Sequence, residues 1–169
     1  MKYTEKRKVL ECYQKHKDMV YKLAWTYCKD NFQAEDAFQE VFYKFLIYHP
    51  KFKTQEHEKA WFIRTTINVC KNMLKSKWNH DILQLEERDS NKILPDGTDD
   101  AFDELKQAVL DLPEKYRVPI HLYYYEEYSV AEIADLLHKC ESTIQTQLQR
   151  GREKIKQTLE RSEANDVGA

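Results

Sequence analysis

The segment from Ser129 to Ile155 constrains the fold of this 169-residue chain most strongly, because its pattern specifies two helices and the turn between them. Ser129 is followed three residues later by Glu132, the reciprocal capping pattern that satisfies free backbone amides at a helix start. A helix is therefore predicted to begin near Val130, and its apolar pattern stops before His138. The predicted inward positions of this helix are Ile133, Ala134, Leu136 and Leu137.

A second helix is predicted after the turn, with Ile144, Leu148 and Ile155 facing inward. A short helix, a tight turn and a polar second helix are typical of a helix-turn-helix. Hydroxyls and amides near the start of the second helix can reach base edges, whereas cations can approach phosphates. The candidate DNA-reading residues are Ser142, Thr143, Gln145, Thr146, Gln149, Arg150 and Arg152, with Lys154 and Lys156 as further phosphate contacts. A helical hairpin with a solvated outer face is the alternative for this segment alone.

Composition favours an all-α fold, because only three glycines and four prolines interrupt a chain rich in helix-forming residues. The formal net charge of -2 and the isoelectric point near 6.3 exclude a uniformly positive surface, so any contact with nucleic acid must be local. No apolar run approaches the roughly 18 residues needed to span a membrane, and the first residues lack a signal-peptide core. We therefore expect a cytoplasmic protein without membrane insertion.

The four cysteines, Cys12, Cys28, Cys70 and Cys140, are far apart and form no Cys-x-x-Cys pair. This spacing indicates neither a zinc site nor a disulfide framework, and we expect reduced, mostly buried thiols. No glycine-rich phosphate loop, paired metal ligands or nucleophile–base set is visible either. The sequence therefore predicts a protein that is not an enzyme and that has no metal or cofactor.

Charge is segregated along the chain and suggests two domains. Residues 51–80 are strongly basic, whereas residues 86–114 are strongly acidic. Within the acidic part, Leu94-Pro95-Asp96-Gly97-Thr98 has turn chemistry and no periodic apolar face, which is typical of a linker. We predict two small helical domains joined by a flexible acidic linker, with domains at 1–80 and 100–161, the linker at 81–99 and a tail at 162–169.

The first domain contains a predicted helix that begins near Ala34 and ends at Pro50, since a residue before proline is pushed out of helical geometry. Its predicted inward stripe is Ala34, Ala37, Phe38, Val41, Phe45 and Tyr48. A later helix carries Arg64, Asn68, Lys71 and Lys75 along one face. Such a stripe either contacts DNA phosphates or is a solvated helix face. Nearby aromatic residues favour binding of single-stranded DNA, because unpaired bases stack on aromatic rings. We also expect at least one of Trp61 and Phe62 to be a core residue.

Four segments together resemble the bacterial RNA polymerase sigma factors of the short, two-domain extracytoplasmic-function (ECF) class. They are Ala34-Glu35-Asp36-Ala37-Phe38-Gln39-Glu40-Val41-Phe42, Ala60-Trp61-Phe62-Ile63-Arg64-Thr65-Thr66-Ile67-Asn68, Leu112-Pro113-Glu114-Lys115-Tyr116-Arg117, and Ser129 to Arg152. The segments occur in the order and at the spacing of that class and cover roughly residues 10 to 158.

The resemblance implies promoter-specific transcription initiation with three partners: core RNA polymerase through its β′ and β subunits, promoter DNA, and an anti-sigma factor. The implied polymerase-binding residues are Asp36, Gln39, Glu40 and Phe42. The segment from Lys51 to Lys77 would open the minus-ten element and hold one strand, through Lys59, Trp61, Arg64, Asn68, Lys71 and Lys75. The helix-turn-helix would read the minus-thirty-five element.

Several positions depart from the pattern of the class. Gln145 and Gln147 stand where Lys and Arg are frequent, which should change the sequence preference, and Glu127 and His138 stand at frequent glycine positions. Pro119 falls inside an expected helix and should kink it or shift its boundary. The rival hypothesis is a polymerase-independent helix-turn-helix regulator, which would leave the first domain without a role.

Overall fold

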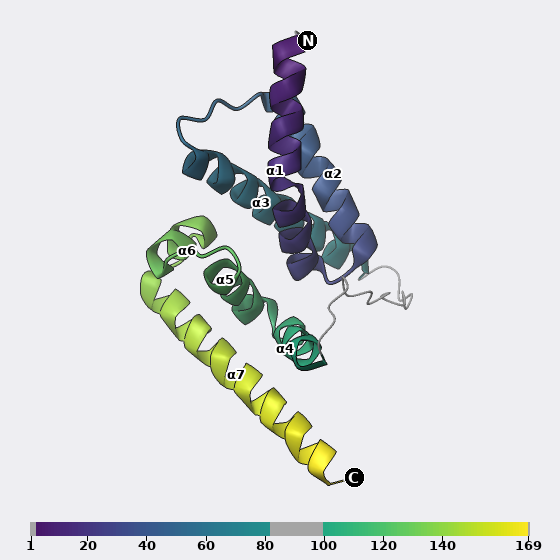
Figure 1. Ribbon diagram of the computed structural model, residues 1–169, viewed down its shortest axis with the longest axis vertical. Coiled ribbons are helices and arrows are strands. Elements are labelled where there is room, and N and C mark those ends of the chain that lie inside the picture. Colours follow the sequence, from purple (N-terminus) through teal and green to yellow (C-terminus); the bar gives the residue numbers. More distant parts are fainter. Residues whose placement is uncertain (1–2, 82–99, 169) are drawn as a thin grey trace. The chain divides into compact units, whose positions relative to one another are not determined.

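The computed structural model describes residues 3–81 and 100–168, and the side chains of all of these except 78–81 and 100–102. The described residues form seven helices and no strand, so the predicted all-α fold is confirmed (Figure 1). The chain divides into two compact units, Met1–Ile93 and Leu94–Ala169. The predicted acidic linker at 81–99 lies outside the described residues apart from its first position.

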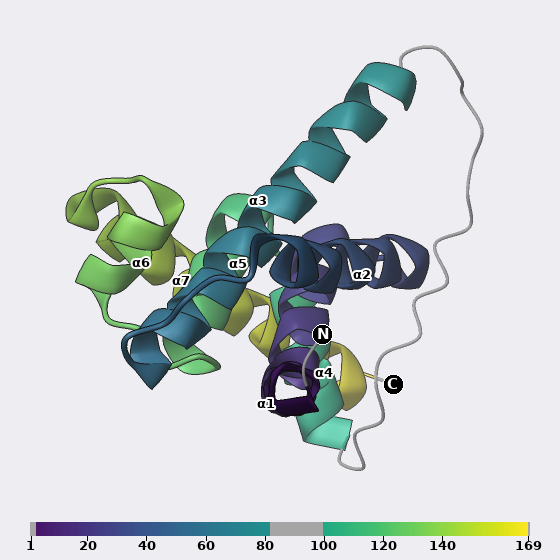
Figure 2. The same ribbon diagram turned by 90° about the horizontal axis from the view of Figure 1, so that it is seen from above.

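The first unit consists of three helices that pack pairwise: α1 (Tyr3–Cys28), α2 (Asn31–Tyr48) and α3 (Gln55–Asp81). Their core is apolar, as expected when amphipathic helices bury one stripe each. The fully buried members include Val20, Leu23, Ala24, Ala34, Ala37, Val41, Phe62, Ile63 and Cys70. The second half of α3 extends beyond α1 and α2 (Figure 2).

Local capping sets the helix boundaries in the first unit. α2 begins at Asn31, three residues before the predicted start, because the Asp30 carboxylate accepts a hydrogen bond of 2.9 Å from the backbone amide of Gln33. At the other end, His49 has a φ of 44° and donates its amide to the Phe45 carbonyl, and Pro50 follows. The predicted end of this helix at Pro50 is therefore confirmed.

An aromatic cluster joins the three helices around Phe62, whose side chain is fully buried. The Phe62 ring lies 5.4 Å from the Phe42 ring and 5.2 Å from the Phe45 ring, both on α2. It also stacks on the His16 imidazole of α1 at 4.5 Å. The prediction of a core aromatic at 61 or 62 is confirmed. The inward assignment of Tyr48 is wrong, because its side chain is 68% exposed on the last turn of α2.

The second unit contains α4 (Asp100–Leu110), α5 (Glu114–Tyr124), α6 (Val130–Leu137) and α7 (Glu141–Val167). The predicted capping box is present: the Ser129 hydroxyl accepts from the Glu132 amide at 3.2 Å, and the Glu132 carboxylate accepts from the Ser129 amide at 2.8 Å. The chain turns at His138, whose φ is 54°, before α7 begins. The helix-turn-helix predicted from sequence is thus confirmed.

The helix-turn-helix is supported by close contact between α5 and α7. A Cβ atom added at Gly151 of α7 would lie 3.0 Å from Cγ1 of Ile120, so the absence of a side chain lets the two helices approach. α5 runs through Pro119 to Tyr124, so the proline does not shift the helix boundary. α7 continues to Val167, six residues beyond the predicted end of the second domain at residue 161.

A buried arginine anchors the start of α5. The Arg117 side chain is 5% exposed and donates a 2.6 Å hydrogen bond to the Leu112 carbonyl, in the turn between α4 and α5. Because a buried guanidinium must be satisfied by acceptors, this contact fixes the turn against the helix.

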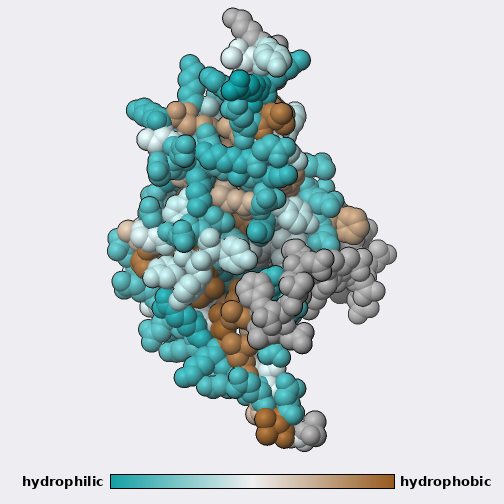
Figure 3. Space-filling model, viewed as in Figure 1, coloured by the Kyte–Doolittle hydropathy of each residue, from teal (hydrophilic) through white to brown (hydrophobic). Residues whose placement is uncertain are grey.

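The surface seen in Figure 3 is mostly hydrophilic, with hydrophobic atoms in small groups. Among residues 3–81 and 100–168, no helix combines the length and hydropathy needed to cross a membrane. The same residues contain no cluster of three or more His, Cys, Asp or Glu side chains suited to a metal ion. Only Cys70 is buried, whereas Cys12 and Cys28 are half-buried and Cys140 is exposed, so the expectation of mostly buried thiols was wrong.

Candidate protein and nucleic-acid interfaces

The outward face of α2 carries most of the residues assigned to polymerase binding. Asp36 and Gln39 are exposed, and Glu40 is half-buried. The Glu40 carboxylate forms an ion pair of 3.2 Å with Lys44, one turn further along the helix. Because surface pairs of this kind contribute little free energy, the carboxylate remains available to a competing partner.

Phe42 does not belong to this face, contrary to the prediction. Its side chain is only 9% exposed, and its ring contacts the rings of Tyr13 at 5.1 Å and Phe38 at 4.9 Å in addition to Phe62. The sequence placed Phe42 next to the polar residues, but a helix turns by about 100° per residue, and this rotation points Phe42 into the aromatic cluster.

Large apolar side chains that the sequence analysis missed accompany the polar residues of α2. Phe32 is 73% exposed, Tyr43 is 58% exposed and Ile47 is 52% exposed. Together with Asp36 and Gln39 they are spaced at three- and four-residue steps, so all five lie on one side of the helix. The same steps were visible in the sequence, but the predicted inward stripe of this helix did not include these three residues and no role was assigned to them. We call these five residues the α2 face.

The candidate minus-ten residues all lie on α3. Arg64, Asn68 and Lys75 are exposed, and Lys59, Trp61 and Lys71 are half-buried. Arg64, Asn68, Lys71 and Lys75 follow one another at helical steps along α3. The structure thus places a basic stripe on an accessible helix surface.

A hollow of about 260 Å³ lies beside this stripe, between the end of α2 and the middle of α3. Trp61 and Asn68 contribute to its wall, together with Tyr48 of α2, and the remaining lining residues are Lys44, Thr65, Val69 and Asn72. Aromatic rings, amides and a cation surround one space, which is the combination that stacks and hydrogen-bonds an unpaired base. The exposure of Tyr48, which contradicted its predicted core position, gives it access to this hollow.

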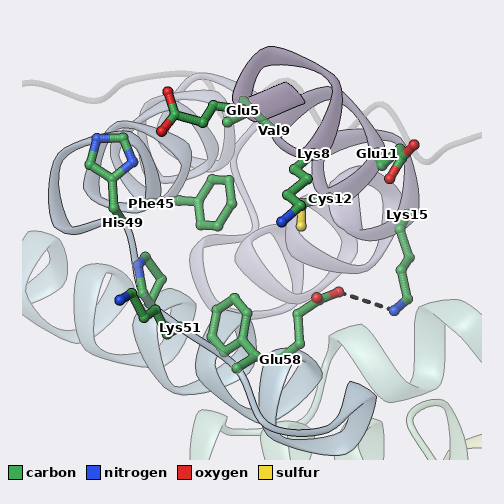
Figure 4. Close-up of a pocket in the computed structure, with 12 residues that line it drawn as sticks. Glu5, Lys8, Val9, Glu11, Cys12, Lys15, Phe45, His49, Lys51 and Glu58 are labelled. Carbon is green, nitrogen blue, oxygen red and sulfur yellow. Dashed lines mark hydrogen bonds and ion pairs between the residues drawn. The ribbon is translucent and has the colours of Figure 1, made fainter. Parts of the chain in front are cut away.

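A second and larger cavity, of about 960 Å³, opens between the first half of α1 and the loop after α2 (Figure 4). Its wall mixes acids and cations, and the Lys15 ammonium pairs with the Glu58 carboxylate at 3.0 Å. Burial and the neighbouring Glu58 raise the pKa of the Cys12 thiol in this wall, which keeps it protonated. Lys51, Phe52 and Glu58 of this wall belong to the predicted strand-opening segment, but none of the candidate DNA-binding or polymerase-binding residues lines the cavity.

All seven candidate minus-thirty-five residues of α7 are exposed: Ser142, Thr143, Gln145, Thr146, Gln149, Arg150 and Arg152. Two have their side chains partly engaged, because the Thr146 hydroxyl donates to the Ser142 carbonyl at 2.9 Å and the Gln149 amide donates to Glu153 at 3.3 Å. Both contacts are local to the helix surface and leave the helix start open to a groove.

Tyrosines of α5 hold Arg152 of α7, an arrangement that the sequence did not predict. Nε of Arg152 donates a 2.5 Å hydrogen bond to Oη of Tyr124, and its guanidinium carbon lies 5.5 Å from the rings of both Tyr123 and Tyr124. Burial would raise the pKa of the Tyr116 phenol, but hydrogen bonds from Arg150 and Lys115 outweigh it and lower that pKa. The contact between Arg152 and Tyr124 joins residues 28 positions apart in the sequence, so no local sequence pattern predicts it.

Comparison with known proteins places both units in one family. Residues 12–80 match the model of sigma-70 region 2, and residues 102–155 match that of sigma-70 region 4. The chain is 30% identical over 129 residues to the RNA polymerase sigma factor SigZ of Bacillus subtilis, which covers 75% of this chain and 73% of SigZ. It is 28% identical over 158 residues to the ECF RNA polymerase sigma factor SigW of the same organism, covering 85% and 84% of the two chains.

The fold is shared with a solved structure, the sigma factor RpoE in complex with the anti-sigma factor NepR from Bartonella quintana. The TM-score is 0.71 at 20% identity, over 93% of this chain and 97% of the other. The sequence matches carry the assignment, since a structure at this identity establishes the fold alone. The chain belongs to the sigma-70 family of RNA polymerase sigma factors, in its extracytoplasmic-function class.

Proposed function

We propose that this promoter-specific initiation factor acts through three surfaces: the α2 face for core RNA polymerase, the α3 stripe for the minus-ten element and the start of α7 for the minus-thirty-five element. The observation that carries the proposal is the presence, in one chain, of regions 2 and 4 in family order. Exposure of nearly all the polar residues assigned to these roles supports it. The proposed domains are 1–80 and 100–161, and the proposed site of action is the cytoplasm.

Docking on polymerase is assigned to the α2 face, with Glu40 as a further contact. Apolar groups at the centre of an interface contribute most of the binding free energy, and polar groups around them set orientation. Tyr43 and Phe32 supply exposed rings, and Asp36 and Gln39 supply acceptors and donors between them. A surface with both properties fits a protein partner better than it fits DNA, which would be repelled by the carboxylates.

Promoter opening is assigned to α3 and to the hollow bounded by Trp61, Asn68 and Tyr48. Extruding a base from duplex DNA costs a few kcal/mol, which stacking on a ring and contacts to phosphates can offset. The hollow of about 260 Å³ supplies the rings and amides, and the neighbouring Arg64 and Lys71 supply the cations. No covalent chemistry is required of the chain in this mechanism.

An anti-sigma factor is the third proposed partner. The related RpoE structure was solved in complex with the anti-sigma factor NepR, which supports a partner of that kind here. Such a partner would compete with polymerase for the exposed surfaces of the first and second units.

Mixing the purified chain with bacterial core RNA polymerase and measuring both complex formation and run-off transcription from a promoter library tests the proposal. We expect a stable complex and a small set of selected transcripts. Binding to duplex DNA without any association with core polymerase would contradict the proposal and would support a polymerase-independent regulator instead.

A further inference from the structure

Tyrosines of α5 contact cations on two opposite sides of α7. Gly151 packs against Ile120 of α5, so its neighbours in sequence, Arg150 and Arg152, point to opposite flanks of α7. On one flank Tyr124 and Tyr123 hold Arg152. On the other flank the Tyr116 ring lies 5.0 Å from the Lys115 ammonium and 6.0 Å from that of Lys154.

The reading residues lie between these flanks. With 3.6 residues per turn, Ser142, Thr146 and Gln149 fall along the middle of the exposed surface of α7, between the directions of Arg150 and Arg152. With a rise of about 1.5 Å per residue, the two arginines are about 6 to 9 Å further along the axis than Thr146. α7 therefore carries polar, base-reading side chains near its start and one arginine on each flank about one to two turns further along.

This arrangement matches the dimensions of a DNA major groove, which is about 12 Å wide and 8.5 Å deep and has a phosphate backbone along each edge. A helix that enters by its start would place Ser142 and Thr146 near the floor. Arg150 and Arg152 would then reach the two rims, where the phosphates lie. Cations on both flanks would each meet a different strand.

We infer that Tyr124 is a positioning residue for DNA binding, which holds Arg152 of α7 so that the guanidinium faces a phosphate at one rim of the groove. The inference rests on the proposed function of the second unit. Tyr124 occupies only Nε of Arg152, and within the described part of the chain no acceptor contacts the terminal nitrogens of that guanidinium. A held arginine loses less side-chain entropy on binding than a mobile one, so the tyrosine contributes to affinity without touching DNA.

The test uses holoenzyme formed from the full chain and core polymerase, bound to a promoter duplex that the wild-type holoenzyme transcribes. Dissociation constants are measured over a range of salt concentrations for the wild type, Tyr124→Phe, Arg152→Gln and the double variant. Tyr125→Phe is the matched control, because Tyr125 is adjacent and similarly exposed, at 54% against 55%, and its ring stacks on that of His121.

We expect Tyr124→Phe to raise the dissociation constant roughly three- to tenfold, as the loss of one hydrogen bond implies. Arg152→Gln should also lower the slope of log affinity against log salt by about one. In the Arg152→Gln background, Tyr124→Phe should have no further effect, and Tyr125→Phe should match the wild type. A loss that persists in the Arg152→Gln background would overturn the inference, as would an unchanged Tyr124→Phe variant.

Failure of the proposed function would look different, since wild-type holoenzyme would then not form or would select no promoter. Failure of the inference alone would leave wild-type transcription intact and the tyrosine variants indistinguishable from it.

Discussion

His16 of α1 and Glu58 of α3 form a hydrogen bond, with Nε2 of the imidazole 2.6 Å from Oε1 of the carboxylate. The imidazole is 3% exposed and stacks on Phe62, so it is enclosed by the core. The same carboxylate oxygen accepts from Lys15 at 3.0 Å. A neutral imidazole donating to a carboxylate paired with a lysine satisfies all three groups without leaving a buried charge alone.

This pair predicts loss of stability in mild acid. Burial lowers the pKa of His16 below its usual value of 6.5, an effect that Lys15 and Lys59 reinforce and that Glu58 only partly offsets. Burial would raise the pKa of Glu58, but the hydrogen bonds from His16 and Lys15 outweigh it, and that pKa is lowered. The unfolded chain then binds protons before the folded one does, so the free energy of unfolding falls as pH drops below about 6.5.

Denaturant unfolding followed by circular dichroism measures this dependence. A range from about pH 7.5 to about pH 4.5 is suitable, because histidine and carboxyl groups titrate in it. His16→Gln keeps a donor for Glu58 but cannot titrate. The free energy of unfolding of this variant should therefore vary less between pH 7 and 5 than that of the wild type, since this interval spans the ordinary pKa of histidine, about 6.5. His57→Gln, at an exposed position in the first turn of α3, is the control. Equal pH slopes for His16→Gln and the wild type would contradict the assignment.

Combining Asp36→Ala, Gln39→Ala and Glu40→Ala should weaken binding to core polymerase by about tenfold or more, since several interface contacts are lost together. Helicity should be retained, because none of these side chains is buried. Core binding is measured by fluorescence anisotropy of the labelled chain.

The exposed face of α1 offers a control of the same composition: Glu11, Gln14 and Asp18. The triple alanine variant at these positions should bind core polymerase like the wild type. If both triple variants lose affinity equally, charge alone determines the effect and the docking assignment fails.

Arg64→Ala combined with Lys71→Ala should reduce promoter opening more than it reduces core binding, because removal of two phosphate contacts weakens the hold on the separated strand. Opening is followed by permanganate reactivity of thymines at the minus-ten element. Arg7→Ala with Lys17→Ala removes the same two charges from α1 at matched exposure and should leave opening unchanged. Unchanged opening in the α3 variant would identify the stripe as a solvated helix face.

Gly151→Ala should lower the free energy of unfolding of the second unit, even though alanine favours helices by about 1 kcal/mol. The added methyl group would meet Cγ1 of Ile120 at 3.0 Å and Cδ1 at 3.2 Å in a buried position. Overpacking of this kind costs about 1–3 kcal/mol. Gly168→Ala is the control, since its nearest neighbour would be the Ala164 carbonyl at 3.5 Å. Urea unfolding of the two variants separates them, and equal stabilities would show that Ile120 simply moves aside.

His138→Gly should raise the free energy of unfolding by about 1 kcal/mol, because a left-handed backbone is unfavourable for residues with a Cβ atom. His138 ends α6 with a φ of 54°, and Glu127 has a φ of 58° in the preceding turn. His138→Ala keeps the Cβ atom and should give no gain, so it separates backbone conformation from loss of the imidazole. A thermal shift of the same size for both variants would contradict this explanation.

The sequence by itself determined the all-α class, the helix-turn-helix and its boundaries, and the surface positions on α3 and α7. These features depend on capping groups and on apolar steps of three and four residues, which act within a single helix and can be read from a single segment. Ser129 and Glu132 satisfy each other's amides wherever the helix packs. The glycine positions of the ECF pattern occupied by Glu127 and His138 were also visible, and both residues adopt the conformation that favours glycine.

Tertiary structure decided which apolar residues are buried and which distant groups meet. Phe42 and Tyr48 are both aromatic members of α2, yet one lies in the core and the other beside the hollow, because the neighbouring helices cover only one side of α2. The contacts of Glu58 with His16 and of Arg152 with Tyr124 span 42 and 28 residues. Such contacts depend on how helices approach one another in space, which no periodicity within one helix encodes.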